Sequence, residues 1–245
     1  MKNLLRIPLI IYQLLVFYPL LILLTALTAL STIILSYLTT KRTVHAIPAT
    51  LWSHAMCAIA FVRVRVEGLE RLDPKQSYIV TANHQSWFDI WVIYGWLGRP
   101  FSWIMKQELR KVPLLGLACE RIGHIFIDRS NPVEARKSIE KAEKTLRGGH
   151  CVVIFPEGTR SKNGKVGIFK RGAFSMASDL LLPVAPISIS GAYRVMSRKA
   201  WWVTPGTITM QIHEPVPCDH KLQDSEIRAF ANQIREIIVS GIKHN

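Results

Sequence analysis

The chain has 245 residues, of which 49% are apolar, and a formal net charge of +14. This length fits one compact domain with a short extension, and the charge predicts attraction to a polyanion, either nucleic acid or an anionic lipid surface. No helix-turn-helix or zinc-finger pattern accompanies the charge, so we expect no nucleic-acid partner. No Cys-x-x-Cys pair occurs, which excludes zinc-ribbon and redox spacing and favours reduced thiols at Cys57, Cys119, Cys151 and Cys218.

The N-terminal stretch from Ile7 to Thr40 contains no charged side chain. A continuous helix of this length would run about 50 Å, beyond the roughly 30 Å of a bilayer's hydrocarbon core. Pro19 predicts a break that divides the stretch into two helices. A cleaved signal peptide is the alternative, but its apolar region should be only about 7–15 residues long. We therefore expect residues 1–43 to form a membrane anchor of one or two helices, which either spans the bilayer or lies in one leaflet.

After the anchor, short β-branched or apolar runs alternate with helical patterns. Strands are predicted over residues 61–66, 77–81, 122–127, 151–155, 183–189 and 207–212. Helices are predicted over 130–149, where a proline and a glycine pair suit the two ends, and over 225–242. This alternation predicts an α/β domain over residues 44–245, with a mixed, partly parallel sheet flanked by helices.

The densest motif is Thr81-Ala82-Asn83-His84-Gln85-Ser86-Trp87-Phe88-Asp89, which follows a predicted strand and precedes a helix. Open α/β sheets gather their functional sites at such carboxyl ends. Ser86 and Asp89 fit a capping box, but this structural interpretation leaves His84 unexplained. An imidazole just outside a helix can meet a carboxylate in its first turn. We therefore expect His84 to be a general base whose ring Asp89 holds in the useful tautomer.

A second motif, Phe155-Pro156-Glu157-Gly158-Thr159-Arg160, also follows an apolar strand. One interpretation is a strand-to-loop turn in which Gly158 supplies an unusual backbone angle. A nucleotide-binding loop that reaches Gly164 is excluded, because five residues rather than four separate the glycines and Val166 replaces the magnesium-binding hydroxyl. Arg160 remains as a candidate bidentate ligand for a phosphate.

Three weaker patterns complete the sequence. The segment from Gly123 to Arg129 ends a predicted strand, and Arg129 is another candidate ligand for a phosphate. Pro183 to Ile187 is an apolar run. Neither segment alone can be distinguished from one with a purely structural role. The third is a basic, tryptophan-containing cluster of Arg194, Arg198, Lys199, Trp201 and Trp202. It predicts a further, reversible contact with anionic lipid; the alternative is that the two tryptophans are partly buried beneath a surface loop.

Together and in this order, these segments resemble the glycerolipid acyltransferase family, and within it the bacterial 1-acylglycerol-3-phosphate acyltransferases. The match runs from about Val62 to Pro217, and its blocks Asn-His-x-x-x-x-Asp and Phe-Pro-Glu-Gly-Thr-Arg are specific. The resemblance implies that His84 and Asp89 form the catalytic dyad, with Arg160 on the acceptor's phosphate. The acceptor site that it implies comprises Glu157, Gly158, Thr159, Arg160, Arg129 and Lys106.

The same resemblance implies a reaction and its partners. A fatty-acyl group would pass from acyl-CoA or acyl-carrier protein to the 2-hydroxyl of 1-acylglycerol-3-phosphate (lysophosphatidic acid), giving phosphatidic acid. It implies no cofactor beyond this thioester co-substrate, no metal and no covalent acyl-enzyme. The expected location is the inner, cytoplasmic membrane, where anionic lipids are partners and the catalytic domain faces the cytosol.

Other functions explain fewer of these features. The alternative within the family is another lysophospholipid as the acceptor, with the enzyme remodelling phospholipid rather than synthesising it. A metal-dependent phosphatase lacks His-Glu-x-x-His or clustered carboxylates, and a serine lipase lacks Gly-x-Ser-x-Gly. A non-enzymatic membrane adaptor explains the anchor and the charge but leaves both specific motifs without a role.

Overall fold

The computed structural model of the protein describes residues 6–39, 46–128 and 148–243. Its strands are β1 (Val62–Glu67), β2 (Ile79–Ala82), β3 (Phe101–Lys106), β4 (Ile125–Ile127), β5 (Cys151–Ile154), β6 (Val184–Ser190) and β7 (Gly206–Ile212). Its helices are α1 (Arg6–Tyr12), α2 (Tyr18–Leu38), α4 (Ile47–Ile59), α5 (Phe88–Trp96), α6 (Leu115–Ile122), α8 (Gly172–Leu180), α9 (Ala192–Val195) and α10 (Asp224–Ser240). The helix predicted over 130–149 lies outside the described residues except for its last two positions.

The strands form one seven-stranded sheet in the order β1-β7-β6-β2-β5-β3-β4. Neighbouring strands are parallel except for β6 and β7, which run antiparallel, so the predicted mixed sheet is confirmed. The sequence did not predict β3, because Ser102 interrupts its apolar pattern. Ser102 is nevertheless fully buried, and its hydroxyl donates a hydrogen bond to the carbonyl oxygen of Gly123 (2.7 Å). A satisfied hydroxyl of this kind can occupy a buried strand.

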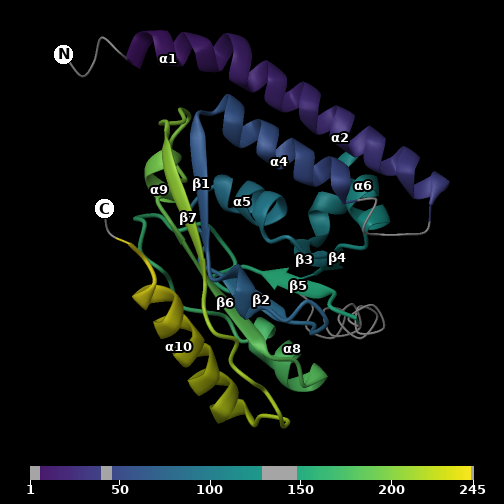
Figure 1. Ribbon diagram of the computed structural model, residues 1–245, viewed down its shortest axis with the longest axis vertical. Coiled ribbons are helices and arrows are strands. Elements are labelled where there is room, and N and C mark those ends of the chain that lie inside the picture. Colours follow the sequence, from purple (N-terminus) through teal and green to yellow (C-terminus); the bar gives the residue numbers. More distant parts are fainter. Residues whose placement is uncertain (1–5, 40–45, 129–147, 244–245) are drawn as a thin grey trace.

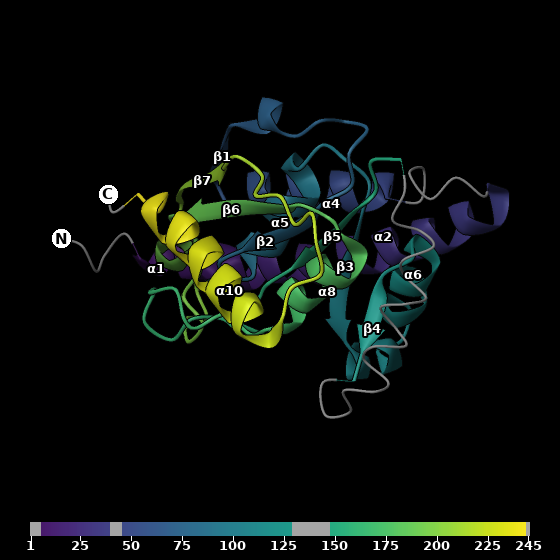
Figure 2. The same ribbon diagram turned by 90° about the horizontal axis from the view of Figure 1, so that it is seen from below.

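Helices cover both faces of the sheet (Figures 1 and 2). On one face, α4, α5 and α9 enclose a core that includes Met56, Phe88 and Ile187. On the other face, α8 and α10 enclose a second core that includes Phe174 and Ile234. The predicted C-terminal helix is confirmed as α10, whose buried side chains recur at helical spacing: Ile227, Phe230, Ala231, Ile234 and Ile238.

The N-terminal apolar segment is a single helical run. Its backbone hydrogen-bond pattern changes at Gln13–Phe17, which form a π-helical turn between α1 and α2. Pro19 lies in the first turn of α2, directly after the π-helical turn, so the backbone hydrogen bonds change where the proline supplies no N–H. Of the two predicted arrangements, the structure has the single helical run, and the π-helical turn lies just before Pro19, where the break was predicted. By length and composition, Ile7–Leu38 is the one run in the described residues able to cross a membrane, with a mean hydropathy of 2.3.

This N-terminal run packs on the rest of the protein rather than standing apart from it. In Figure 1, α2 lies along α4. Apolar side chains of the run remain exposed, among them Leu15 and Ile22. Phe17 is 1% exposed and meets the ring of Trp91 edge-on, a burial that contributes about 1.5–3 kcal/mol to the contact. The boundary predicted after residue 43 lies outside the described residues, so it stays a prediction.

A loop between α9 and β7 lies against the same helical run. The side-chain amide of the buried Gln13 pairs with the backbone of Val203 through both of its polar atoms. Nε2 donates to the carbonyl oxygen of Val203 (2.5 Å), and Oε1 accepts from its N–H (2.9 Å). The Tyr18 hydroxyl donates to the carbonyl oxygen of Trp201. Trp201 is 81% exposed, so it is not buried beneath a loop, whereas Trp202 is 51% exposed and therefore half-buried.

Candidate active site

The carboxyl ends of β2 and β5 bring the two specific motifs together. Both strands are parallel and adjacent, and the first motif follows β2 while the second follows β5. Parallel neighbours end at the same edge of a sheet, so loops 83–88 and 155–167 meet there. The site therefore comes from the position of the motifs in the sheet rather than from their separation in the sequence.

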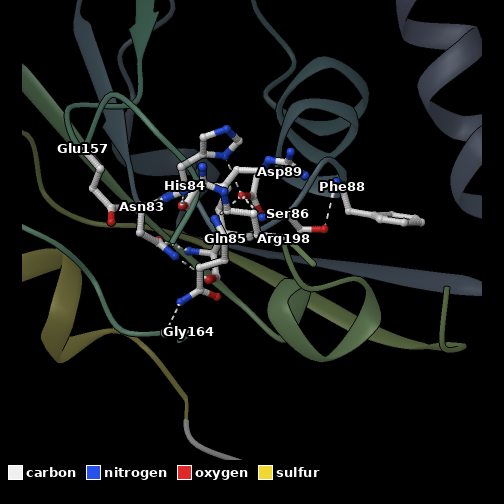
Figure 3. Close-up of polar contacts among 11 residues, drawn as sticks. Asn83, His84, Gln85, Ser86, Phe88, Asp89, Glu157, Gly164 and Arg198 are labelled. Carbon is white, nitrogen blue, oxygen red and sulfur yellow. Dashed lines mark hydrogen bonds and ion pairs between the residues drawn. The ribbon is translucent and has the colours of Figure 1, made fainter. Parts of the chain in front are cut away.

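His84 and Asp89 point toward each other across the start of α5 (Figure 3). His84 Nδ1 lies 2.9 Å from Asp89 Oδ2. The same oxygen accepts hydrogen bonds from the backbone N–H groups of Gln85 (2.6 Å) and Ser86 (2.8 Å). Because Oδ2 acts as an acceptor for both backbone N–H groups, it also accepts from His84, whose Nδ1 then carries the hydrogen. Nε2 is then the nitrogen with a free lone pair, which is the form that a general base requires.

The surroundings fix the His84 ring but leave it partly accessible. Its plane stacks on Phe155, with ring centroids 4.0 Å apart and an interplanar angle of 7°. The His84 side chain is 13% exposed, whereas Asp89 is completely buried. A substrate hydroxyl can therefore reach the imidazole from one side, while the carboxylate behind it is shielded from water.

Glu157 holds the two loops together through the backbone. Its Oε1 accepts the N–H of His84 (2.7 Å), and its Oε2 accepts the N–H of Gly167 (2.8 Å). Burial raises the pKa of this carboxyl, and the two backbone hydrogen bonds oppose that rise. The carbonyl oxygen of His84 in turn accepts the N–H of Ser161 (2.7 Å). The backbone of His84 is therefore held from both sides by the loop that follows β5.

Asn83 and Gln85 complete these connections. The side-chain amide of Asn83 both donates to and accepts from the backbone of Ile189 on β6, at 2.9 and 2.7 Å. Gln85 Nε2 donates to the carbonyl oxygen of Gly164 (2.7 Å). The sequence motif therefore contains two further residues whose amides fix the loop that carries His84.

Gly158 forms the turn that brings Arg160 back toward the first motif. Its φ of +71° is strained for other residues, and an added Cβ would lie 3.0 Å from Lys170 Nζ. The N–H of Gly158 donates to the carbonyl oxygen of Phe155 (3.0 Å), so it closes the turn instead of facing a substrate. Thr159 is exposed on the same loop.

Arg160 lies beside the dyad as a half-buried cation. Its guanidinium carbon is 4.4 Å from the centre of the Trp87 ring, a cation–π contact that orients the group. Burial lowers the pKa of Arg160, as does the nearby charge of Arg198, while Asp89 opposes the shift. Arg160 is therefore close enough to both Asp89 and Arg198 for their charges to act on it.

Of the remaining predicted acceptor residues, Lys106 is the one that the structure describes, and it is not brought into these contacts. Lys106 ends β3 and forms an exposed ion pair with Glu108 (2.6 Å). Arg129 lies outside the described residues. In the ranges 6–39, 46–128 and 148–243, no group of three His, Cys, Asp or Glu side chains is arranged to hold a metal ion.

The comparisons with known proteins fit this geometry. A family model described as "Acyltransferase" matches residues 63–190, which include both motifs. The chain belongs to the acyltransferase family. The acyltransferase is also similar over 98% of its length to the crystal structure of PlsC, the 1-acyl-sn-glycerophosphate acyltransferase of Thermotoga maritima. The TM-score is 0.79 at 29% identity, and 96% of that chain is covered.

Two relatives carry related names. A chloroplastic 1-acyl-sn-glycerol-3-phosphate acyltransferase of Arabidopsis thaliana is 32% identical over 72% of the acyltransferase. One from Pseudomonas aeruginosa is 37% identical over 63% of it. The matched region spans 49% of the first relative and 59% of the second.

Proposed function

We propose that this acyltransferase moves a fatty-acyl group from an acyl thioester to the 2-hydroxyl of 1-acylglycerol-3-phosphate, giving phosphatidic acid. The observation that carries the proposal is the hydrogen-bonded pair of His84 and Asp89 with the cationic Arg160 beside it. A base next to a phosphate ligand suits an acceptor whose reacting hydroxyl and phosphate are close together. The names of the similar proteins support the same acceptor.

The proposed mechanism is direct transfer. His84 Nε2 removes the proton from the acceptor hydroxyl as its oxygen attacks the thioester carbonyl. The carbon–sulfur bond then breaks, and the imidazolium returns the proton to the leaving thiolate of coenzyme A or acyl-carrier protein. Asp89 stabilises the imidazolium while it exists, because its buried negative charge faces Nδ1–H.

Arg160→Ala should weaken use of lysophosphatidic acid by about 10- to 150-fold, the size of a lost charged hydrogen bond. The penalty should be smaller for a lysolipid without an exposed phosphomonoester. Initial rates with both acceptors at varied concentration measure the two penalties. Arg171→Ala is a matched control, because this arginine lies at the start of α8 and pairs with Asp224. Equal penalties for both acceptors would assign Arg160 a structural role only.

We further propose that the acyltransferase is bound to the cytoplasmic membrane by α1 and α2, with its catalytic domain toward the cytosol and the helix in one leaflet. The helix packs on α4 and α6 instead of leaving the domain, and its outer side chains are apolar and exposed. Trp201 and Trp202 lie in the loop that Gln13 and Tyr18 hold, a position that suits an interface. All four cysteines are free and buried, which suits a reducing compartment.

A tag placed before residue 1 tests this orientation in inverted inner-membrane vesicles. A helix in one leaflet leaves the tag and the catalytic domain on the same side, so added protease should remove both. The full-length protein should remain with the vesicles through a wash in about 1 M salt, which screens surface charges. A protected tag would show that the helix crosses the bilayer, and release by salt would show that it is no anchor.

A further inference from the structure

A second arginine lies against Arg160, although it is distant in the sequence. Arg198, in the loop between α9 and β7, donates a hydrogen bond from Nη1 to the carbonyl oxygen of Arg160 (3.1 Å); Figure 3 labels Arg198 beside the first motif. No ion pair within the described ranges includes either arginine. Two neighbouring guanidinium groups repel each other, and an anion bound between them removes that repulsion.

The N-terminal helix holds the loop that carries Arg198 at two positions, Trp201 and Val203. Gln13 clamps the backbone of Val203 through both ends of its amide, and Tyr18 bonds the backbone of Trp201. Gln13 is 4% exposed and Val203 is 1% exposed, so both hydrogen bonds are sheltered from water. The loop that carries Arg198 is therefore attached at one end to a buried contact with the apolar helix.

Resting on the proposed function, we propose that Arg198 is a second ligand for the acceptor's phosphate, held beside Arg160 by the N-terminal helix. Arg198 is exposed, and its remaining N–H groups are available to phosphate oxygens. The exposed Trp201 and Trp202 follow it in the same loop, at a place suited to the lipid–water interface. A lysolipid held in that interface presents its headgroup at the depth of this loop, where the guanidinium groups of Arg160 and Arg198 can both bind its phosphate.

Glycerol 3-phosphate, the headgroup fragment, tests the site without catalysis. Detergent-solubilised full-length protein should gain thermal stability as the ligand is added, while glycerol alone should have no effect. Arg198→Ala should raise the Kd from this titration by about tenfold to a hundredfold. The Kd of Arg198→Lys should lie between those of the wild type and Arg198→Ala, because lysine keeps the charge but loses the planar guanidinium. Arg194→Ala removes the same charge from the neighbouring helix and should leave the Kd unchanged.

Kinetics separate this inference from the proposed function. Arg198→Ala should raise the KM for lysophosphatidic acid by a similar factor while leaving the KM for the acyl thioester unchanged. If the wild type binds glycerol 3-phosphate through Arg198 but does not acylate lysophosphatidic acid, the proposed acceptor is wrong and the anion site stands. If Arg198→Ala binds glycerol 3-phosphate as the wild type does, or if the wild type does not bind it, the proposal is overturned.

Gln13→Met tests the role of the helix. The substitution keeps the size of the side chain but leaves the N–H and C=O of Val203 without their partners, so the loop should loosen. We expect the Kd for glycerol 3-phosphate to rise, as in Arg198→Ala, while the KM for the acyl thioester stays unchanged. An unchanged Kd would overturn the part of the proposal in which the helix positions Arg198.

Discussion

Replacing His84 with alanine should lower kcat by about a hundredfold to ten-thousandfold, because it removes the base that takes the acceptor's proton. The fold should survive. Asp89 Oδ2 keeps the backbone N–H groups of Gln85 and Ser86, and Glu157 and Ser161 still hold the backbone of residue 84. The melting temperature should therefore change little, and rates under saturating donor and acceptor measure the loss in kcat.

His220→Ala is the matched control, since this histidine is exposed in the segment before α10 and should not affect kcat. A His84→Ala enzyme that turns over at a rate close to that of the wild type would remove His84 from the mechanism. A large fall in the melting temperature would instead assign the loss of activity to the fold.

Asp89→Asn should reduce kcat by a similar factor, about a hundredfold to ten-thousandfold, because a neutral amide does not stabilise the imidazolium. The amide oxygen can still accept the three N–H groups that now converge on Oδ2. The amide NH2 then falls at the position of Oδ1, which is buried and has no partner within the described residues. An unpaired donor there should cost about 1–3 kcal/mol of folding free energy.

Measurements of kcat and of denaturant unfolding separate the two effects of Asp89→Asn. Unlike His84→Ala, this variant should be both slower and less stable. A variant that is less stable but turns over normally would mean that Asp89 only anchors the loop. One that is slow but as stable as the wild type would mean that another group accepts the amide.

The sequence predicted the dyad because its geometry is local. His84 and Asp89 are separated by less than two helical turns, so a strand, a short loop and the start of a helix suffice to bring them together. The same holds for the strands with clear periodicity, such as β1, whose arginines at 63 and 65 are exposed as their alternation predicts.

What the sequence did not predict depends on packing between distant segments. Gln13 and Val203 are 190 positions apart, and the buried amide in an apolar helix gives no sign of its partner. Arg198 was assigned only to a lipid contact, because its hydrogen bond to Arg160 follows from the meeting of two loops. The double acceptor role of Glu157 likewise requires both loops in place. Such contacts leave no periodic pattern in the sequence.

The most direct test of the proposed function is the mass of the product. Purified full-length protein should receive an acyl-CoA of defined chain, together with an equimolar panel of lysolipids that includes lysophosphatidic acid. The proposed reaction predicts phosphatidic acid carrying the added acyl group as the main product, with one free thiol released per molecule. His84→Ala should form this product about a hundredfold to ten-thousandfold more slowly. Acylation of another lysolipid while lysophosphatidic acid remains unchanged, or thiol release without an acylated lipid, would contradict it.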